Sequence, residues 1–385
     1  MAYADFQMEI YLGGLQGVVP EYPLAYRALQ RAARRVLSDE AFDYVAGSAG
    51  SEDTLRANRE AFRKWRLVPR LLRDVSVRDV STRLFDVDLP APVLLAPVGV
   101  QSIVHPEAEI AVARAAAELG LPLVLSTLSS KTLEEVATAS GDNTRWFQLY
   151  WPNDKEITTS FLHRAEQAGY SAVVVTLDTA YLAWRPRDLS HAFLPFLRGE
   201  GIANFVSDPV FRSGLAQSPE EDPQSAVLRW ASVFSAPTHS WAELAELRAA
   251  TRLPILLKGI QHPDDARAAL NAGVDGLIVS NHGGRQVDGA VGSLDSLPAI
   301  AEAVAGRVPV LFDSGIRTGA DIVKARALGA DAVLVGRPYV WGLAIGGDAG
   351  VKQVLRALLA EMDLTLALTG CSSWDDVGPD LLVPL

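Results

Sequence analysis

The sequence has 385 residues, of which 49% are hydrophobic, and it carries a net charge of −11. This length and composition predict a globular protein with a sizeable core, in one large or two ordinary domains. The negative charge argues against a nucleic-acid partner, because binding to phosphate backbones needs basic patches. It is compatible with a small anionic substrate, which needs only a local cluster of arginine and lysine.

The single cysteine and the first residues restrict the cellular context. Cys371 alone cannot form an intramolecular disulfide or a zinc site built on cysteines, and we expect a small buried residue near the end of the last helix. The start, "MAYADFQMEIYLGG", has no basic region followed by an apolar run, unlike a signal peptide. The most apolar segment, "LPAPVLLAPVGVQSIV", contains three prolines and is too short to span a bilayer. We therefore expect a cytoplasmic protein with no membrane partner.

The chain divides into three parts, which we expect to form a single domain over residues 1–385. Residues 1–91 have a helical pattern, clearest in 22–47, and we expect this N-terminal helical segment to pack across the bottom or side of the middle part. That middle part, residues 92–345, alternates short apolar runs with helical stretches, and residues 346–385 form a last helix and a tail.

Eight apolar runs in the middle part predict eight strands. They span residues 92–99, 122–127, 145–151, 171–179, 254–259, 276–281, 308–315 and 332–337. Near-continuous apolar runs indicate burial on both faces and therefore a parallel sheet. Several intervening helical stretches end on glycine, as helices commonly do. Eight βα units in about 250 residues predict an α/β fold of the (β/α)8 TIM-barrel type. A doubly wound open sheet is the alternative.

Residues 180–238 interrupt the alternation after the fourth predicted strand. The pieces "WRPRD", "LPFLRGEG" and "SDPVF" in this segment carry prolines among aromatic residues and leucine. An insertion at this point lies on the catalytic face of a barrel, so we expect a lid over the active site. A disordered insert is the alternative, although the content of Trp, Phe and Leu argues against it.

Polar side chains follow almost every predicted strand, at the end where a barrel carries its chemistry. They are Ser126, Thr127, Gln148, Tyr150, Thr176, Asp178, Lys258, Ser280, Asn281, His282, Asp313, Ser314 and Arg337. A lysine at a buried strand end is costly unless paired, so Lys258 is either functional or half of a buried salt bridge. In "SNHGGRQVDG", His282 and Arg285 are either ordinary turn residues or functional groups, and the number of polar strand ends favours function.

The residue types at these ends predict a phosphate-bearing cofactor beside a carboxylate substrate. The segments "FDSGIRTGAD" and "VGRP" follow strands seven and eight, where barrels bind phosphate with backbone N–H groups and a cation, here Arg317 and Arg337. Lys258, His282 and Arg285 would flank a ligand across the barrel mouth. Arginine clamps a carboxylate through two parallel hydrogen bonds, and histidine accepts a proton near neutral pH. No metal-ligand spacing is present, so we expect no metal.

Several of these motifs resemble one family. "SNHGGRQ", "LLKG", "FDSGIRTGADIVKARALGA" and "VGRP" are similar to the FMN-dependent L-2-hydroxy acid oxidising enzymes, and the resemblance runs from about residue 20 to the C-terminus. Within the family, "LDTAYLAWRPRDL", "FLPFLRG", "SDPVF" and "LLKGIQHPDDAR" look most like lactate 2-monooxygenase. The resemblance implies FMN as the cofactor and a homotetramer or homo-octamer.

The resemblance also implies roles for the catalytic and substrate residues. His282 matches the catalytic base, and Asp178 matches the carboxylate that pairs with it and would stabilise the imidazolium. Arg285 matches the arginine that holds the substrate carboxylate, and Arg185 matches a second arginine there. The hydroxyl groups of two tyrosines face the carboxylate and the 2-hydroxyl, and these match Tyr44 and Tyr150.

For the cofactor, Lys258 matches the lysine beside the flavin pyrimidine ring, where its charge stabilises the reduced, anionic flavin. The other matching positions are Pro97, Val98, Gly99, Ser126, Gln148, Thr176, Ser280, Asp313, Ser314, Gly315, Arg317, Gly336 and Arg337. Two positions depart from the family pattern. Gly99 stands where many oxidases have alanine, and we expect it to leave room at the reactive edge of the flavin. Leu128 stands where glycolate oxidases have tryptophan, which bears on substrate size.

We therefore expect oxidation of a short L-2-hydroxy acid, above all L-lactate, by molecular oxygen. If pyruvate stays under the lid, the products are acetate, carbon dioxide and water; if it leaves first, they are pyruvate and hydrogen peroxide. A dehydrogenase with another electron acceptor is a further alternative. A flavin-free barrel lyase or isomerase and a non-catalytic binding protein are alternatives from other classes. We expect His282 to remove a proton from the substrate. Two descriptions of the electron transfer stay open: transfer of a hydride to the flavin, and formation of a substrate carbanion.

Overall fold

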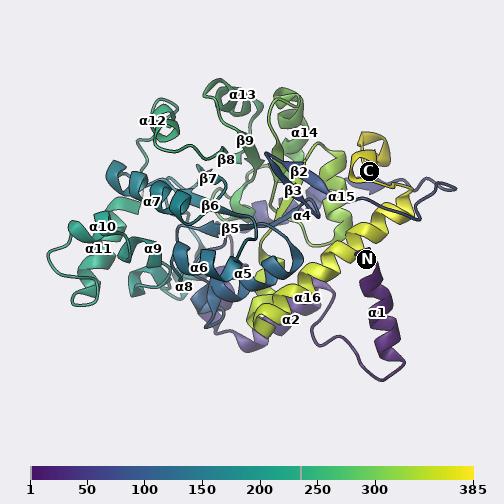
Figure 1. The fold of residues 1–385 in the computed structure, drawn as a ribbon, viewed down its shortest axis with the longest axis horizontal. Coiled ribbons are helices and arrows are strands. Elements are labelled where there is room, and N and C mark those ends of the chain that lie inside the picture. The colour runs from purple at the N-terminus through teal and green to yellow at the C-terminus, as the bar shows by residue number, and fades with distance from the viewer. Residues whose placement is uncertain (1, 235) are drawn as a thin grey trace.

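A computed structural model describes residues 2–234 and 236–385 and contains a closed barrel of eight parallel strands. The strands are β4 (Val93–Leu95), β5 (Leu123–Ser126), β6 (Arg145–Tyr150), β7 (Val173–Thr176), β8 (Ile255–Ile260), β9 (Gly276–Val279), β10 (Val310–Phe312) and β11 (Ala332–Val335). Consecutive strands are neighbours, as the run from β5 to β9 shows in Figure 1, and β11 pairs with β4 to close the barrel. The predicted (β/α)8 barrel is confirmed.

Alternate side chains of the strands fill the inside of the barrel, so its interior is a packed core and not a channel. The inward-facing cluster consists of Leu94, Val124, Trp146, Val174, Leu256, Ile278, Leu311 and Leu334, with Ala96, Ala172 and Ala332. An antiparallel hairpin of β2 (Thr82–Leu84) and β3 (Val87–Leu89) adds Leu84 and Leu89 to this cluster, and the Phe85 ring lies 5.8 Å from that of Trp146. Since Trp146 lies at the start of β6, the hairpin closes the amino-terminal end of the barrel.

Helices surround the barrel between successive strands and after the last one. They are α5 (Ala108–Leu119), α6 (Leu133–Ser140), α7 (Lys155–Gln167), α13 (Pro263–Asn271), α14 (Ser293–Val304), α15 (Gly319–Ala327) and α16 (Arg337–Thr369), with α12 (Leu244–Ala249) before β8. The last helix, α16, bends at Gly346 and Gly347, and Cys371 is buried just beyond its end, as predicted. Across the described residues, every helix is too short or too polar to cross a membrane.

The N-terminal part is not purely helical. It contains α1 (Asp5–Gly14), α2 (Tyr26–Val36), α3 (Asp39–Ala46) and α4 (Asp53–Arg63), the hairpin, and β1 (Trp65–Leu67), which pairs with β12 (Leu382–Pro384). The prediction that this part packs across the bottom or side of the barrel is right for the hairpin and wrong for α3. The end of α3 lies at the barrel mouth, because Arg285 and Arg337 donate hydrogen bonds to its last carbonyl groups.

The insertion, residues 180–238, is folded where the structure describes it. It contains α8 (Pro186–Ser190), η2 (Pro195–Arg198), α9 (Ala203–Val206), α10 (Pro209–Ser213) and α11 (Pro223–Phe234). Phe205 and Phe211 are fully buried, and the Phe205 ring packs edge-on against Phe161 of α7, with centroids 4.9 Å apart. The alternative of a disordered insert is therefore wrong.

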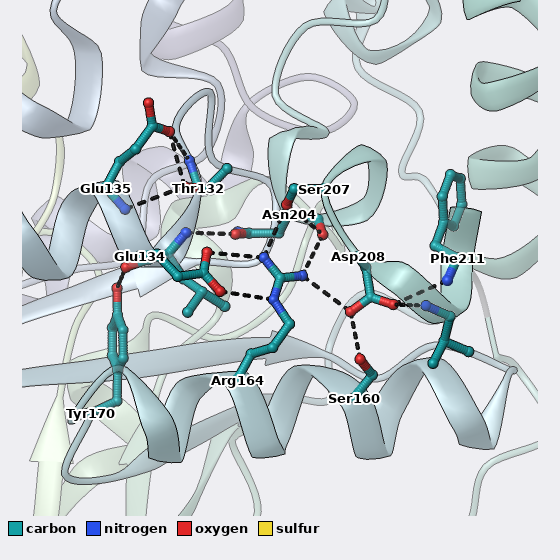
Figure 2. Close-up of polar contacts among 12 residues, drawn as sticks. Thr132, Glu134, Glu135, Ser160, Arg164, Tyr170, Asn204, Ser207, Asp208 and Phe211 are labelled. Atoms are coloured by element: carbon teal, nitrogen blue, oxygen red, sulfur yellow. Dashed lines mark hydrogen bonds and ion pairs between the residues drawn. The ribbon is translucent and has the colours of Figure 1, made fainter. Parts of the chain in front are cut away.

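Buried polar contacts fix the insertion to the barrel helices (Figure 2). Asp208 is fully buried, caps the start of α10, and accepts hydrogen bonds from Ser160 at 2.7 Å and Arg164 at 3.1 Å, both on α7. Arg164 also forms a two-point ion pair with Glu134 of α6. Breaking the buried pair of Arg164 and Asp208 would leave an uncompensated charge, so these contacts hold the middle of the insertion firmly.

Asn204 of α9 ties the insertion to the loop that comes after β5. This fully buried side chain accepts a hydrogen bond from the backbone N–H of Leu133 at 2.8 Å and donates one to the carbonyl of Thr127 at 3.1 Å. The same loop carries Leu128, which lines a cavity at the barrel mouth. The insertion and the rim of the barrel are therefore one packed unit.

Candidate active site

A cavity of about 1100 Å³ opens at the carboxyl ends of the barrel strands. Most of the predicted site residues line it: Tyr44, Pro97, Val98, Gly99, Ser126, Tyr150, Arg185, Lys258, His282, Arg285, Asp313, Ser314, Gly315, Arg317, Gly336 and Arg337. Asp178, Gln148 and Ser280 contact these lining residues from behind. Thr176 lines a second, neighbouring cavity instead.

His282 follows β9 and lies between a carboxylate and a hydroxyl group. Its Nδ1 is 2.8 Å from Asp178 Oδ1, and its Nε2 is 3.4 Å from the hydroxyl oxygen of Tyr150. Burial lowers the pKa of His282 below its ordinary value, although Asp178 opposes this effect. Burial alone would raise the pKa of Asp178, but the neighbouring His282 holds it below its ordinary value. The pair presents a neutral imidazole that can accept a proton and an ionised carboxylate that stabilises the resulting cation.

The backbone of His282 has a φ of 58°, in the left-handed region that residues other than glycine rarely adopt. Two contacts hold it there. Ser280 Oγ accepts a hydrogen bond from the His282 N–H at 3.1 Å, and the side chains of Asn281 and Asn58 exchange two hydrogen bonds of 2.8 and 2.7 Å. Such strain costs about 1–3 kcal/mol and persists only where the surroundings impose it. Asn58, on α4, is a supporting residue that sequence reasoning missed, since nothing in its helical pattern marks it.

Two arginines and a tyrosine form one cationic side of the cavity. Arg285 donates hydrogen bonds to the carbonyls of Tyr44 at 2.6 Å and Gly47 at 2.9 Å, and its guanidinium lies 5.0 Å from the centre of the Tyr44 ring. Arg185 donates to the carbonyl of Arg285 at 3.0 Å. Burial, reinforced by the charge of Arg285, lowers the pKa of Arg185 to about 10. A carboxylate bound between the two guanidinium groups would relieve this repulsion.

A second cationic cluster lies where α16 begins. Arg337 donates hydrogen bonds to three backbone carbonyls, those of Val45, Gly47 and Gly283. Burial, together with the charges of Arg317 and Arg285, lowers the pKa of Arg337 to about 9. Because a helix N-terminus also favours negative charge, this corner of the cavity suits a phosphate group.

Between the two clusters lie polar groups that fit an aromatic cofactor. Lys258 Nζ lies 2.9 Å from Ser280 Oγ and 3.2 Å from Asp313 Oδ2, so Lys258 both lines the cavity and forms a buried ion pair. Gln148 accepts a hydrogen bond from Ser126 at 2.9 Å, whereas its buried Nε2 has no partner among the described residues. An unpaired buried donor costs about 1–3 kcal/mol, and an acceptor on a bound ring would remove that cost.

Gly99 allows the loop after β5 to approach the loop after β4. A Cβ atom at this position would lie 2.8 Å from the carbonyl oxygen of Leu128 and 3.2 Å from its Cβ. That carbonyl also accepts a hydrogen bond from the N–H of Val100 at 2.7 Å. The expectation that Gly99 leaves open room is therefore wrong, because Leu128 occupies the space that a methyl group would take.

The insertion supplies lining residues that the sequence analysis did not single out. They are Leu182, Phe196 and Phe234, together with Thr179 just before the insertion. Phe196 is buried, and its ring centre lies 6.4 Å from that of Tyr44. Large apolar residues in a segment expected to cover the site are the signal that could have identified them.

The barrel and its cavity define a class of protein: a barrel enzyme with a place for a phosphate-bearing cofactor beside an anionic substrate. Residues 33–384 match the family described as FMN-dependent dehydrogenase. The chain belongs to this family, its cofactor is FMN, and its activity is the oxidation of 2-hydroxy acids. The resemblance seen in the sequence is thereby confirmed at the level of the family.

Relatives cover nearly the whole chain. The FMN-dependent alpha-hydroxy acid dehydrogenase qulF of Penicillium citrinum is 46% identical over 384 residues, which are 99% of this chain and 96% of the relative. An L-lactate oxidase of Lysinibacillus sphaericus is 46% identical over 352 residues, 91% of this chain and 90% of the relative. A crystal structure of mandelate oxidase with (S)-4-hydroxymandelic acid is 41% identical, with a TM-score of 0.83 over 94% of this chain and 98% of the other.

Proposed function

We propose that the protein is an enzyme of the lactate 2-monooxygenase type, which converts L-lactate and oxygen into acetate, carbon dioxide and water. One oxygen atom of O2 enters acetate and the other leaves as water. The observation that carries the proposal is the folded insertion, anchored by buried polar contacts, which places Arg185 and Phe196 over the cavity that His282 lines. Such a covered site favours retention of the first product.

The substrate carboxylate binds between Arg285 and Arg185, with Tyr44 beside them. The planar guanidinium of Arg285 is held by the carbonyls at the end of α3, so its remaining donors are oriented before substrate arrives. This places the 2-carbon near His282 and the 2-hydroxyl near Tyr150. A side chain as small as the methyl group of lactate suits the apolar wall formed by Leu128, Phe196 and Phe234.

His282 accepts the proton that leaves the substrate. Its lowered pKa keeps the imidazole neutral at physiological pH, and Asp178 stabilises the imidazolium that forms. FMN, when bound, takes two electrons from the substrate and passes them to oxygen. We assign its ring to Lys258, Gln148 and Ser126, and its phosphate to the corner formed by Arg317 and Arg337. The other predicted cofactor residues line the same cavity, except Ser280, which contacts Lys258 from behind, and Thr176, which lines the neighbouring cavity.

Product fate depends on how long pyruvate stays bound. The same arginines hold the pyruvate carboxylate while hydrogen peroxide forms in the same cavity. Peroxide then adds to the ketone carbon, the bond between carbons 1 and 2 breaks, and acetate, carbon dioxide and water result. If pyruvate leaves first, the enzyme is an L-lactate oxidase that releases pyruvate and hydrogen peroxide. Several relatives carry the name L-lactate oxidase.

The test has two parts. L-lactate added without oxygen should bleach the flavin, which establishes the substrate. Aerobic turnover should then give acetate in an amount equal to the lactate consumed, with little peroxide. Peroxide equal to lactate consumed would replace the monooxygenase proposal with the oxidase, and turnover only with an added electron acceptor would replace it with a dehydrogenase. We further propose a cytoplasmic protein that assembles as a homotetramer or homo-octamer.

A further inference from the structure

A second cavity, of about 820 Å³, lies next to the active-site cavity. It is bounded by residues in or just after strands β6, β7 and β8, among them Trp151, Leu177 and Leu257. Residues that come after α11, among them Pro237, His239, Trp241 and Leu244, form the rest of its wall. The proposed mechanism makes no use of this space. Its lining contains no Asp, Glu, Lys or Arg among the described residues.

The two cavities share three lining residues, Tyr150, Thr179 and Phe234. Phe234 is the last residue of α11, and its ring centre lies 5.3 Å from that of Tyr150 and 5.2 Å from that of Trp230. The hydroxyl of Tyr150 in turn lies 3.4 Å from Nε2 of His282. Phe234 therefore stands at the boundary between the cavities, one side chain away from the base.

The second cavity combines uncharged polar side chains, Thr176, Thr179 and Ser240, with an aromatic and aliphatic wall that suits an alkyl chain. The ring of His239 lies tilted against that of Trp151, with centres 4.1 Å apart, and burial lowers the pKa of His239, which favours the uncharged imidazole. Aromatic and aliphatic side chains around it would bury a hydrocarbon chain at a gain of about 0.8 kcal/mol per methylene group.

We propose that Phe234 determines substrate specificity: its ring closes the passage between the cavities and restricts the enzyme to short 2-hydroxy acids. Without that ring, the second cavity accepts the chain of a longer acid whose carboxylate stays on Arg285. This inference rests on the proposed oxidation of lactate, because it assumes the same carboxylate and base positions.

The experiment compares L-2-hydroxyoctanoate with L-lactate as reductants of the flavin in the holoenzyme without oxygen. In Phe234→Ala, the ratio of the second-order reduction constants, octanoate over lactate, should rise about tenfold or more, the size expected for access to an apolar pocket. The dissociation constant of 2-oxooctanoate, measured from the flavin spectrum, should fall by a similar factor. Phe234→Leu, which retains an apolar side chain, should show the same direction with a smaller change if the alanine variant does not fold.

Two matched variants make the test specific. Phe211→Leu alters a buried aromatic ring of the same insertion that lines neither cavity, so it should leave the ratio unchanged. Ala180→Trp, at an exposed residue that lines only the second cavity, should cancel the gain when combined with Phe234→Ala. An unchanged ratio in the Phe234 variants, or an equal rise in Phe211→Leu, would overturn the inference. Failure of lactate to reduce the unaltered enzyme would instead overturn the proposed function, so the two failures are distinguishable.

Discussion

The reactivity proposed for His282 depends on its neighbours more than on its residue type. Burial favours the neutral ring, Asp178 orients it, and the contacts of Ser280 and the Asn58–Asn281 pair impose its left-handed backbone. Each of these contributions can be removed separately. Substitutions of His282 and of Asp178 therefore distinguish loss of the imidazole that accepts the proton from loss of the carboxylate that orients it.

Replacing His282 with Gln should leave FMN bound but slow flavin reduction by lactate about 10²–10⁴-fold, because hydrogen bonding survives and the base does not. The rate is measured by stopped-flow bleaching of the flavin without oxygen. The flavin content of the purified variant serves as the control for folding. Reduction close to the normal rate would show that another group removes the proton.

The pH dependence follows from the lowered pKa of His282. The protonated imidazole is no base, so kcat/KM should fall as the pH decreases through a value below about 6.5, the ordinary pKa of histidine. Since Asp178 raises the pKa of His282, Asp178→Asn should move this acid limb to lower pH and also slow the reaction. The pH profiles of both enzymes test this. A limb that stays in place or moves to higher pH would contradict the assigned pairing.

Ion pairs hold the insertion, residues 180–238, at its first helix, α8, as well as near its middle at Asp208. Arg187 of α8 pairs with Glu52 at 2.8 Å and Asp43 at 3.3 Å, next to Tyr44 of α3. These contacts join the start of the insertion to the helix whose last carbonyls orient Arg285. Ion pairs to Asp43 and Glu52 therefore add to the attachments that Asp208 and Asn204 provide near the middle of the insertion.

Loosening the near end should release product early. Arg187→Met should raise the fraction of pyruvate and peroxide released during aerobic turnover, by up to about fivefold, since a partly exposed ion pair contributes up to about 1 kcal/mol. Flavin reduction should change less. Arg212→Met provides the control, because its pair with Glu220 at 2.7 Å lies in the same insertion on the solvent side. An equal effect of both variants would indicate general loosening and not release at the mouth.

The sequence allowed some elements to be predicted because their signals are local. Each barrel strand is a short run of buried residues, and the observed strands start and end within the predicted ranges or one residue beyond. The position of α3 could not be predicted in this way. It depends on hydrogen bonds from Arg285 and Arg337 across more than two hundred residues of sequence. The close approach of Leu128 to Gly99 could not be predicted for the same reason, since Leu128 comes from another loop.

In the whole molecule, the net charge is negative, whereas the active-site cavity is lined by a cluster of positively charged side chains. The chain carries a net charge of −11, whereas Arg185, Arg285, Arg317, Arg337 and Lys258 all line one cavity. A local positive field in an acidic protein attracts small anions without attracting nucleic acid. This distribution suits both a carboxylate substrate and a phosphate-bearing cofactor.

The assembly of the molecule is the fourth prediction. Large apolar side chains on α1, including Met8, Tyr11 and Leu12, and Leu15 just beyond it are more than half exposed. Surfaces of this kind are commonly covered in oligomers. Sedimentation velocity should give the mass of four or eight chains. A stable monomer at the concentrations used for kinetics would contradict this expectation.

The proposed monooxygenase activity requires that pyruvate stay in the cavity until peroxide has reacted with it. The most direct measurement is turnover of L-lactate under ¹⁸O2 with catalase present, which destroys any peroxide that escapes. We predict acetate equal to the lactate consumed, with one labelled oxygen atom in its carboxylate. Accumulation of pyruvate in place of acetate would contradict the account, because it would show that both products leave the site before they react.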